Sequence, residues 1–182
     1  MKTLKTIESA DESIKIVLIG LDNSGKTSIL SCLKGIKRIS AFNSPMPTKG
    51  LDVQQFESLH SKYAIWDLGG QQAYLDDYFN DFNKYVKGAN KIIYVIDIQN
   101  VKRYEIALEY LEKVINSIDK KSNIDFSVFL HKFDPDLVFD RDLNEKVINN
   151  FIANIKETIP PEFIYSLYKT TIYAIFEKST AL

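Results

Sequence analysis

Cysteine is nearly absent from the sequence, in which Cys32 is the only one among 182 residues. No intramolecular disulfide bond can therefore form, and a reducing compartment such as the cytoplasm is the simplest location. Cys32 lies in a segment whose apolar spacing predicts a helix, and we expect its thiol to be buried and structural rather than reactive.

Long hydrophobic runs and an excess of charge of one sign are absent as well. No run approaches the roughly 20 apolar residues that span a membrane, and the first residues lack the apolar core of a signal peptide. Lys2 stands where N-myristoylation needs glycine and the last four residues hold no cysteine for prenylation, so we expect no lipid anchor. The formal net charge is −1, which gives no reason to expect a nucleic acid as a partner.

What remains is the composition of a folded domain with a sizeable core, 45% hydrophobic and 26% charged. We expect residues 1–13, which are polar apart from Leu4 and Ile7, to form a flexible arm. Residues 14–182 are then expected to form one domain. Its final helical segment, residues 173–182, is short, which is compatible with a truncated chain or with pairing to another subunit.

The most informative stretch is Gly20–Thr27, whose sequence GLDNSGKT fits the pattern G-x-x-x-x-G-K-[ST]. It follows an apolar, strand-like run and precedes a helical pattern, which is the context that a phosphate-binding loop requires. Loop N–H groups and the helix N-terminus would hold phosphate oxygens, Lys26 would reach the β- and γ-phosphates, and the Thr27 hydroxyl could bind Mg²⁺. The residues expected to contact phosphates are Asp22, Asn23, Ser24, Gly25, Lys26, Thr27 and Ser28.

A second loop, Asp67-Leu68-Gly69-Gly70-Gln71, follows a predicted strand. Asp67 could hold Mg²⁺ directly or through water. The Gly70 backbone could approach the γ-phosphate, and Gln71 could orient a water molecule for in-line attack. The aromatic residues that come next, in 72–86, repeat at helical spacing; a stripe facing the core is the favoured interpretation, and a partner-binding surface that changes with the nucleotide is the alternative.

Apolar periodicity predicts alternating strands and helices along the chain. We expect strands over residues 14–19, 51–57, 63–66, 91–97, 126–130 and 163–168, and helices over 28–33, 72–86, 101–119, 143–155 and 173–182. This alternation predicts a three-layer α/β domain with a mostly parallel six-stranded sheet, in which a hairpin supplies one antiparallel edge strand. Right-handed crossovers would bring the candidate loops together at the carboxyl edge of the sheet.

A third candidate loop, which includes Lys132 and Asp134, follows the predicted strand over 126–130. A carboxylate there could accept hydrogen bonds from N1–H and the exocyclic amine of guanine, a pairing that adenine does not offer. The Lys132 stem could lie over the base, and the backbone N–H groups of Thr171 and Ile172 could reach the guanine O6. On spacing alone, a charged loop without a ligand is an equally open interpretation.

These motifs resemble those of the Ras superfamily of small GTPases, within it the Arf and Rag/Gtr branches. Residues 20–27 and 47–52 are similar to Arf sequences, whereas residues 72–79 and 131–134 look more like Rag. The resemblance implies the P-loop NTPase fold of a Ras-like G domain over residues 14–182. It also implies a γ-phosphate and Mg²⁺ contact from Thr48, and a base-binding His131 where most small GTPases have asparagine.

The leading hypothesis is a switch that binds GTP or GDP with Mg²⁺ and hydrolyses GTP slowly, helped by activating and exchange proteins and read by effectors. Pairing with a second GTPase, the same or another, is a further expectation from the resemblance. The candidate catalytic residues are Gln71, Lys26 and Thr48; the candidate metal ligands are Thr27, Thr48 and Asp67; and the candidate guanine contacts are His131, Lys132, Asp134, Thr171 and Ile172. Two alternatives stay open, a nucleotide-locked subunit that barely hydrolyses GTP and an ATP-using phosphotransferase.

Overall fold

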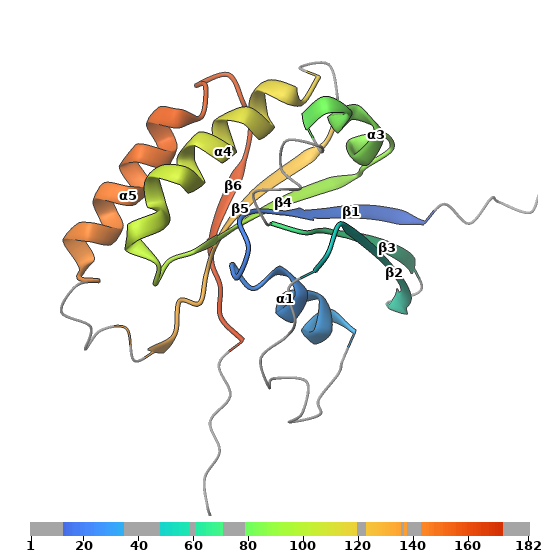
Figure 1. Cartoon of the computed structure of the whole chain (residues 1–182), viewed down its shortest axis with the longest axis horizontal. Coiled ribbons are helices and arrows are strands. Elements are labelled where there is room, and N and C mark those ends of the chain that lie inside the picture. Colours follow the sequence, from blue (N-terminus) through green and yellow to red (C-terminus); the bar gives the residue numbers. More distant parts are fainter. Residues whose placement is uncertain are drawn as a thin grey trace, which may run out of the picture.

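A computed structural model describes residues 13–34, 48–58, 61–70, 79–119, 123–135, 137 and 143–172. Six strands form one sheet in the order β2-β3-β1-β4-β5-β6 (Figure 1). Their bounds are β1 Ile14–Ile19, β2 Leu51–Ser58, β3 Ser61–Leu68, β4 Lys91–Asp97, β5 Asp125–His131 and β6 Ser166–Lys169. Only β2 and β3 pair antiparallel among these strands. The prediction of a mostly parallel sheet with one antiparallel edge strand is therefore confirmed.

Helices cover both faces of the sheet and complete the predicted three layers. On one face lies α1, Lys26–Leu33, and on the other lie α3, α4 and α5, at Phe82–Val86, Tyr104–Ser117 and Glu145–Thr158 (Figure 1). A 3₁₀ turn, η2 at Val101–Arg103, leads into α4. No helix among the described residues is long and apolar enough to cross a membrane.

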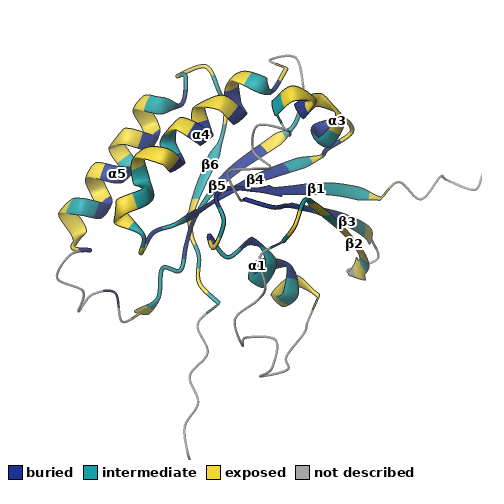
Figure 2. Ribbon diagram, in the orientation of Figure 1, coloured by how far each residue is buried: buried dark blue, intermediate teal, exposed yellow. Residues whose placement is uncertain are grey.

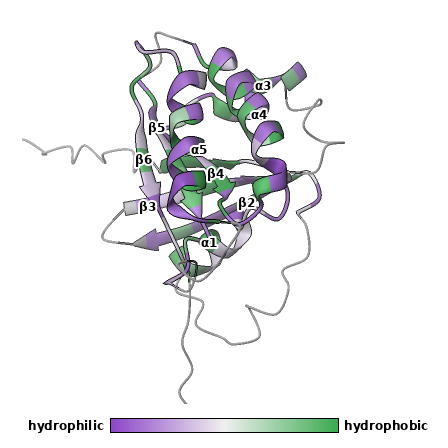
Figure 3. Ribbon diagram, turned by 90° about the vertical axis from the view of Figure 1, so that its left-hand side faces the viewer, coloured by the Kyte–Doolittle hydropathy of each residue, from purple (hydrophilic) through white to green (hydrophobic). Residues whose placement is uncertain are grey.

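The two faces bury separate apolar clusters, because the central strands carry side chains inward on both sides. The larger cluster packs under α4 and α5 around Tyr94, Leu111 and Phe151, and the smaller one packs under α1 around Leu18 and Leu30. The sheet-facing sides of the helices are buried while their outer sides are exposed (Figure 2). Hydrophobic and hydrophilic residues alternate around α4 and α5 accordingly (Figure 3), which is the pattern of amphipathic surface helices.

Two local expectations were wrong. Cys32 is exposed rather than buried, because α1 buries only its first part, with Ile29 at 7% and Leu33 at 49% exposure. The last strand begins at Ser166 rather than at residue 163. Phe163 instead donates its backbone N–H to the carbonyl of Pro160 in a turn, and packs its ring edge-on against Phe126.

Other predictions fall wholly or partly outside the described residues. Of the arm over residues 1–13, only the last residue is described. The final segment, residues 173–182, lies wholly outside the described residues. Of the aromatic stretch over residues 72–86, the structure describes residues 79–86. Within that part Phe82 is buried and Phe79 packs against the core, which favours the core-facing interpretation for these two rings.

Candidate nucleotide-binding site

The loop between β1 and α1 has the backbone shape of a phosphate-binding loop. Asn23 and Gly25 adopt positive φ angles of 58° and 95°, a region where glycine fits without strain and asparagine is tolerated. Gly25 is the N-cap residue of α1, and a Cβ at that position would overlap the ring of His131. Glycine is therefore required at position 25 both by the backbone conformation and by the close approach of β5.

Lys26 is buried inside this loop, with 5% of its surface exposed. Its Nζ donates hydrogen bonds to the carbonyls of Gly20 at 2.9 Å and Leu21 at 2.8 Å. Burial lowers the pKa of Lys26 to about 8, while the carboxylates of Asp67 and Asp22 act in the opposite direction. Lys26 Nζ also donates to the Ser24 hydroxyl at 3.5 Å. A buried ammonium held by these neutral oxygens is a strong site for an anion, since phosphate oxygens are better partners for its charge.

Two hydroxyls and one carboxylate meet beside Lys26. Thr27 Oγ1 donates to Asp67 Oδ2 at 2.7 Å, Thr48 Oγ1 donates to the same oxygen at 3.2 Å, and the two hydroxyls lie 3.1 Å apart. These residues come from α1, from the residue range before β2, and from β3. The three predicted metal ligands are therefore adjacent in space.

Asp67 lies at the centre of this cluster and is fully buried. Burial raises the pKa of its carboxyl group, and the hydrogen bond from Thr27 and the charge of Lys26 oppose that rise. Its second oxygen, Oδ1, has no hydrogen-bond partner among the described residues. Hard oxygen donors with one unsatisfied carboxylate oxygen fit Mg²⁺, which prefers few protein ligands and keeps water molecules. No group of three His, Cys, Asp or Glu residues that could hold a metal occurs in the described part of the chain.

The segment after β3 lies against the phosphate loop. The Asp22 N–H donates to the Gly70 carbonyl at 2.9 Å, and the Gly69 N–H donates to the Gly50 carbonyl at 2.8 Å. A Cβ on Gly70 would overlap the backbone of Leu21 and Asp22, so that only glycine permits this approach. Gln71, the predicted water-orienting residue, lies outside the described residues.

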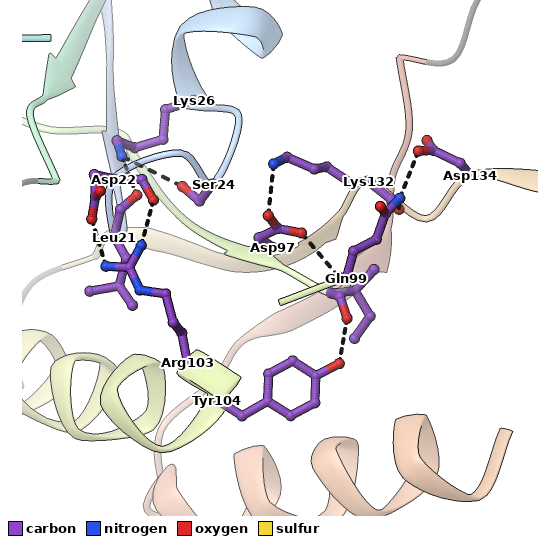
Figure 4. A network of polar contacts seen from close by, with 11 residues as sticks. Leu21, Asp22, Ser24, Lys26, Asp97, Gln99, Arg103, Tyr104, Lys132 and Asp134 are labelled. Carbon is purple, nitrogen blue, oxygen red and sulfur yellow. Dashed lines mark hydrogen bonds and ion pairs between the residues drawn. The ribbon is translucent and has the colours of Figure 1, made fainter. Parts of the chain in front are cut away.

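One arginine in the site has no counterpart among the sequence predictions. Arg103, at the end of η2, donates from Nη2 to the Asp22 carboxylate and from Nη1 to the Asp22 carbonyl at 3.1 Å (Figure 4). The two residues are 81 positions apart in the sequence, and neither a motif nor a periodicity relates them.

The loop after β5 carries the predicted base-binding residues. Lys132 forms an ion pair with Asp97 at 2.7 Å, and Asp134 accepts a hydrogen bond from the Thr171 hydroxyl on one oxygen and from the Gln99 amide, at 2.8 Å, on the other. Thr171 thus contributes a side-chain contact that was not predicted, whereas the predicted backbone contacts of Thr171 and Ile172 with a base stay predictions. Gln99, like Arg103, was not among the residues predicted from the sequence.

His131 stands between the phosphate loop and the base loop. It is 1% exposed, and its Nδ1 lies 2.9 Å from the Thr170 hydroxyl while its ring contacts Gly25. Burial, together with the charge of Lys132, lowers the pKa of the imidazole, so the ring is neutral near pH 7. The His131 ring therefore lies between the phosphate loop and Thr170, which directly follows β6, and its predicted contact with guanine stays a prediction. The remaining predicted phosphate contacts, Asn23, Ser24 and Ser28, lie in or directly after the phosphate loop, and Ser24 is buried.

Comparisons with known proteins agree with this fold. The model of the Arf (ADP-ribosylation factor) family matches residues 1–159. A relative from Dictyostelium discoideum, ADP-ribosylation factor-like protein 2, is 32% identical over 136 residues, which cover 75% of this chain and 69% of that protein. The molecule is thus a small GTPase of the Ras superfamily. Within that class, the chain belongs to the ADP-ribosylation factor family.

A solved structure supports the fold independently. The Arl6 BBS3 small GTPase from Trypanosoma brucei, determined with the bound nucleotide analogue GppNp, superimposes with a TM-score of 0.61. The match covers 88% of this chain and 87% of that one at 16% sequence identity. It confirms the predicted Ras-like G-domain fold. The more Rag-like character of residues 72–79 and 131–134 stays a prediction.

Proposed function

We propose that this chain binds GTP and GDP together with Mg²⁺, hydrolyses GTP slowly, and acts as a conformational switch for protein partners. The observation that carries the proposal is the meeting of Thr27, Thr48 and Asp67, because three separate segments supply hard oxygen atoms beside the phosphate loop. Membership of the Arf family supports it. So does the Arl6 neighbour, whose structure contains the nucleotide analogue GppNp.

The phosphate end of the site would hold the nucleotide through charge and backbone donors. Lys26 would exchange its bonds with loop carbonyls for bonds with the β- and γ-phosphates, and the N–H groups of residues 22–28 would surround the phosphate oxygens. Thr27, Thr48 and Asp67, the last directly or through water, would hold Mg²⁺. Mg²⁺ in such sites neutralises charge on the phosphate oxygens. The Gly70 backbone would approach the γ-phosphate.

The base end of the site would select guanine. Asp134 would accept from N1–H and the exocyclic amine, the Lys132 stem would cover the base, and Thr171 and Ile172 would offer backbone N–H groups to O6. His131 would support this contact from behind. Asp134 argues for guanine and against the alternative of an ATP-using phosphotransferase, because adenine has no matching pair of donors.

Hydrolysis would depend on Gln71 as the residue that orients water, with Lys26 and Thr48 stabilising charge at the γ-phosphate. Intrinsic turnover on the order of 10⁻⁴ to 10⁻² s⁻¹ is expected for such a site. Arg103 is bound to Asp22, so we propose that a stimulating arginine comes from an activating protein. Exchange proteins, effectors and a second GTPase are the further partners of the proposal, in the cytoplasm.

Two measurements on the purified protein test the proposal. Ion-exchange chromatography of nucleotide released by denaturation should give GDP, and phosphate release from added GTP should continue over several turnovers. Mostly GTP in the first measurement and no turnover in the second would instead identify a locked, weakly hydrolysing subunit. An adenine nucleotide would overturn guanine binding by Asp134. The Gln71→Leu variant should bind GTP but lose hydrolysis, whereas Gln55→Leu, on the exposed side of β2, should leave hydrolysis unchanged.

A further inference from the structure

Gln99, directly after β4, makes three contacts that fix it beside the base loop. Its backbone N–H donates to Asp97 Oδ1 at 3.0 Å. Its side-chain Nε2 donates to the Lys132 carbonyl and to Asp134 Oδ2, each at 2.8 Å (Figure 4). Both partners of Nε2 are pure acceptors, so the amide is oriented with its nitrogen toward the loop; the flipped amide would face them with its oxygen. The side chain is therefore held in one position although Gln99 is an exposed residue.

These contacts orient the Asp134 carboxylate from one side while Thr171 orients it from the other. The Thr171 hydroxyl donates to Oδ1 and the Gln99 amide donates to Oδ2. A carboxylate has about four acceptor positions, so one on each oxygen is taken and one on each oxygen is left. Two remaining acceptors, side by side and fixed in direction, match the two neighbouring donors on one edge of guanine.

The backbone of the base loop is fixed by the same residue. Lys132 has a positive φ of 60°, an uncommon conformation for a residue with a side chain. The Gln99 amide holds the carbonyl of this residue, and Asp97 holds its ammonium group. Asp97 and Gln99 together therefore connect the end of β4 to the loop that follows β5.

We propose that Gln99 is a specificity-determining residue of the base site, which holds Asp134 in the orientation for a two-point contact with guanine. The inference rests on the proposed function, because it concerns recognition of a guanine nucleotide. Gln99 acts through Asp134, so it is a positioning residue rather than a catalytic one. Its loss should weaken the contact that distinguishes guanine from related bases and leave the phosphate contacts intact.

Inosine diphosphate is the probe that isolates this effect, because hypoxanthine keeps N1–H but lacks the exocyclic amine of guanine. Dissociation constants for GDP, IDP and ADP should be measured with Mg²⁺ for the wild type, Gln99→Ala, Gln99→Glu and the matched control Gln55→Ala. The wild type should bind GDP about ten- to a hundredfold more tightly than IDP, the range for a hydrogen bond to a charged acceptor. Gln99→Ala should reduce that ratio by about fivefold, close to the net worth of one hydrogen bond.

Gln99→Glu should reduce the ratio further, because it replaces a donor by a charged oxygen beside Asp134. Gln55→Ala should keep the wild-type ratio. A merely structural role would weaken GDP and IDP binding equally and leave the ratio unchanged, which would overturn the inference. Tighter GDP binding by Gln99→Ala, or a wild type that favours GDP over ADP but not over IDP, would overturn it as well. A wild type without preference for GDP over ADP would instead refute the proposed function.

Discussion

The phosphate end and the base end of the site differ in how deeply their polar groups are buried. At the phosphate end, Lys26 and Asp67 are buried, and backbone atoms of the loop and of Gly70 are in direct contact. At the base end, Asp134 is half-buried, and Gln99 and Thr171, which orient its carboxylate, are exposed. A buried polar group that loses its partner costs far more free energy than an exposed one. Phosphate binding should therefore be strong and intolerant of substitution, whereas base selection should be tunable in small steps.

The largest expected effect is a difference in GDP affinity between substitutions of two lysines, one at each end of the site. Lys26→Met removes a buried ammonium and should weaken GDP binding by about 3 kcal/mol, roughly a hundredfold. Lys132→Met removes a half-exposed ammonium, keeps an apolar stem that can cover a base, and should cost about tenfold or less. Titration with a fluorescent GDP analogue measures both. Equal losses of GDP affinity in the two variants would contradict the distinction between the two ends. The control Lys113→Met changes a lysine exposed on α4 and should leave GDP affinity unchanged.

The second contrast concerns the metal. Asp67→Asn removes the charge of the buried carboxylate beside Thr27 and Thr48, so GDP should dissociate about ten times faster with Mg²⁺ present, at the rate seen when the metal is chelated. The matched variant Asp125→Asn changes a carboxylate that is paired with Lys91 and 59% exposed. It should keep the slow, Mg²⁺-dependent rate. If GDP dissociated from Asp67→Asn at the wild-type rate and a chelator still accelerated it, Asp67 would not be a ligand of the metal.

A pH series sharpens the same comparison through Lys26. Burial lowers the pKa of Lys26 to about 8 in the free protein, and bound phosphate would raise it again. Above about pH 8 the complex therefore holds one proton more than the separated partners, so the GDP affinity should be constant below pH 7 and fall above pH 8, by up to about tenfold per pH unit. Lys26→Met, measured over the same pH range, should not show this fall in GDP affinity. An identical fall in that variant would mean that a group of the nucleotide titrates rather than Lys26.

The smallest expected difference concerns two ion pairs, of which the one at the base end is the more buried. Arg103 and Asp22 pair at the phosphate end with side-chain exposures of 32% and 40%, whereas Lys132 and Asp97 pair at the base end with exposures of 28% and 14%. Double-mutant cycles on the free energy of unfolding would replace each aspartate by Asn, and Arg103 and Lys132 by Gln. The coupling energy should be about 0.5 kcal/mol for Arg103 with Asp22 and about 1 kcal/mol for Lys132 with Asp97. A stronger coupling for Arg103 and Asp22 would contradict this ranking.

The candidate site residues that could be predicted from the sequence belong to short motifs, each of which carries its own signal. Residues 20–27 form a motif whose spacing is itself the signal, and Lys132 and Asp134 are two positions apart. Arg103 and Gln99 carry no such signal, because each meets its partner only after folding. The register of β4 with β5, in which Asp97 lies opposite His131, brings Gln99 beside the base loop from 35 positions away.

Element boundaries show a similar limit. The apolar residues near 163 predicted a strand. In the structure Phe163 packs against the core from a turn, whereas Ile164 is 90% exposed. Cys32 has helical spacing yet lies in the part of α1 that buries little. Periodicity identifies which side chains are apolar and regularly spaced, whereas burial depends on where neighbouring elements end.

His131 gives the two ends of the site a common support, since one ring contacts Gly25 and bonds to Thr170. A nucleotide is one molecule with two anchors, and once its phosphates are bound, its base is presented to the second anchor at a high effective concentration. The size of that chelate gain depends on how well the spacing between the anchors is fixed. GDP should therefore bind more tightly than the separately measured affinities of guanosine and pyrophosphate would suggest, because only the linked molecule benefits from a fixed spacing between the two anchors.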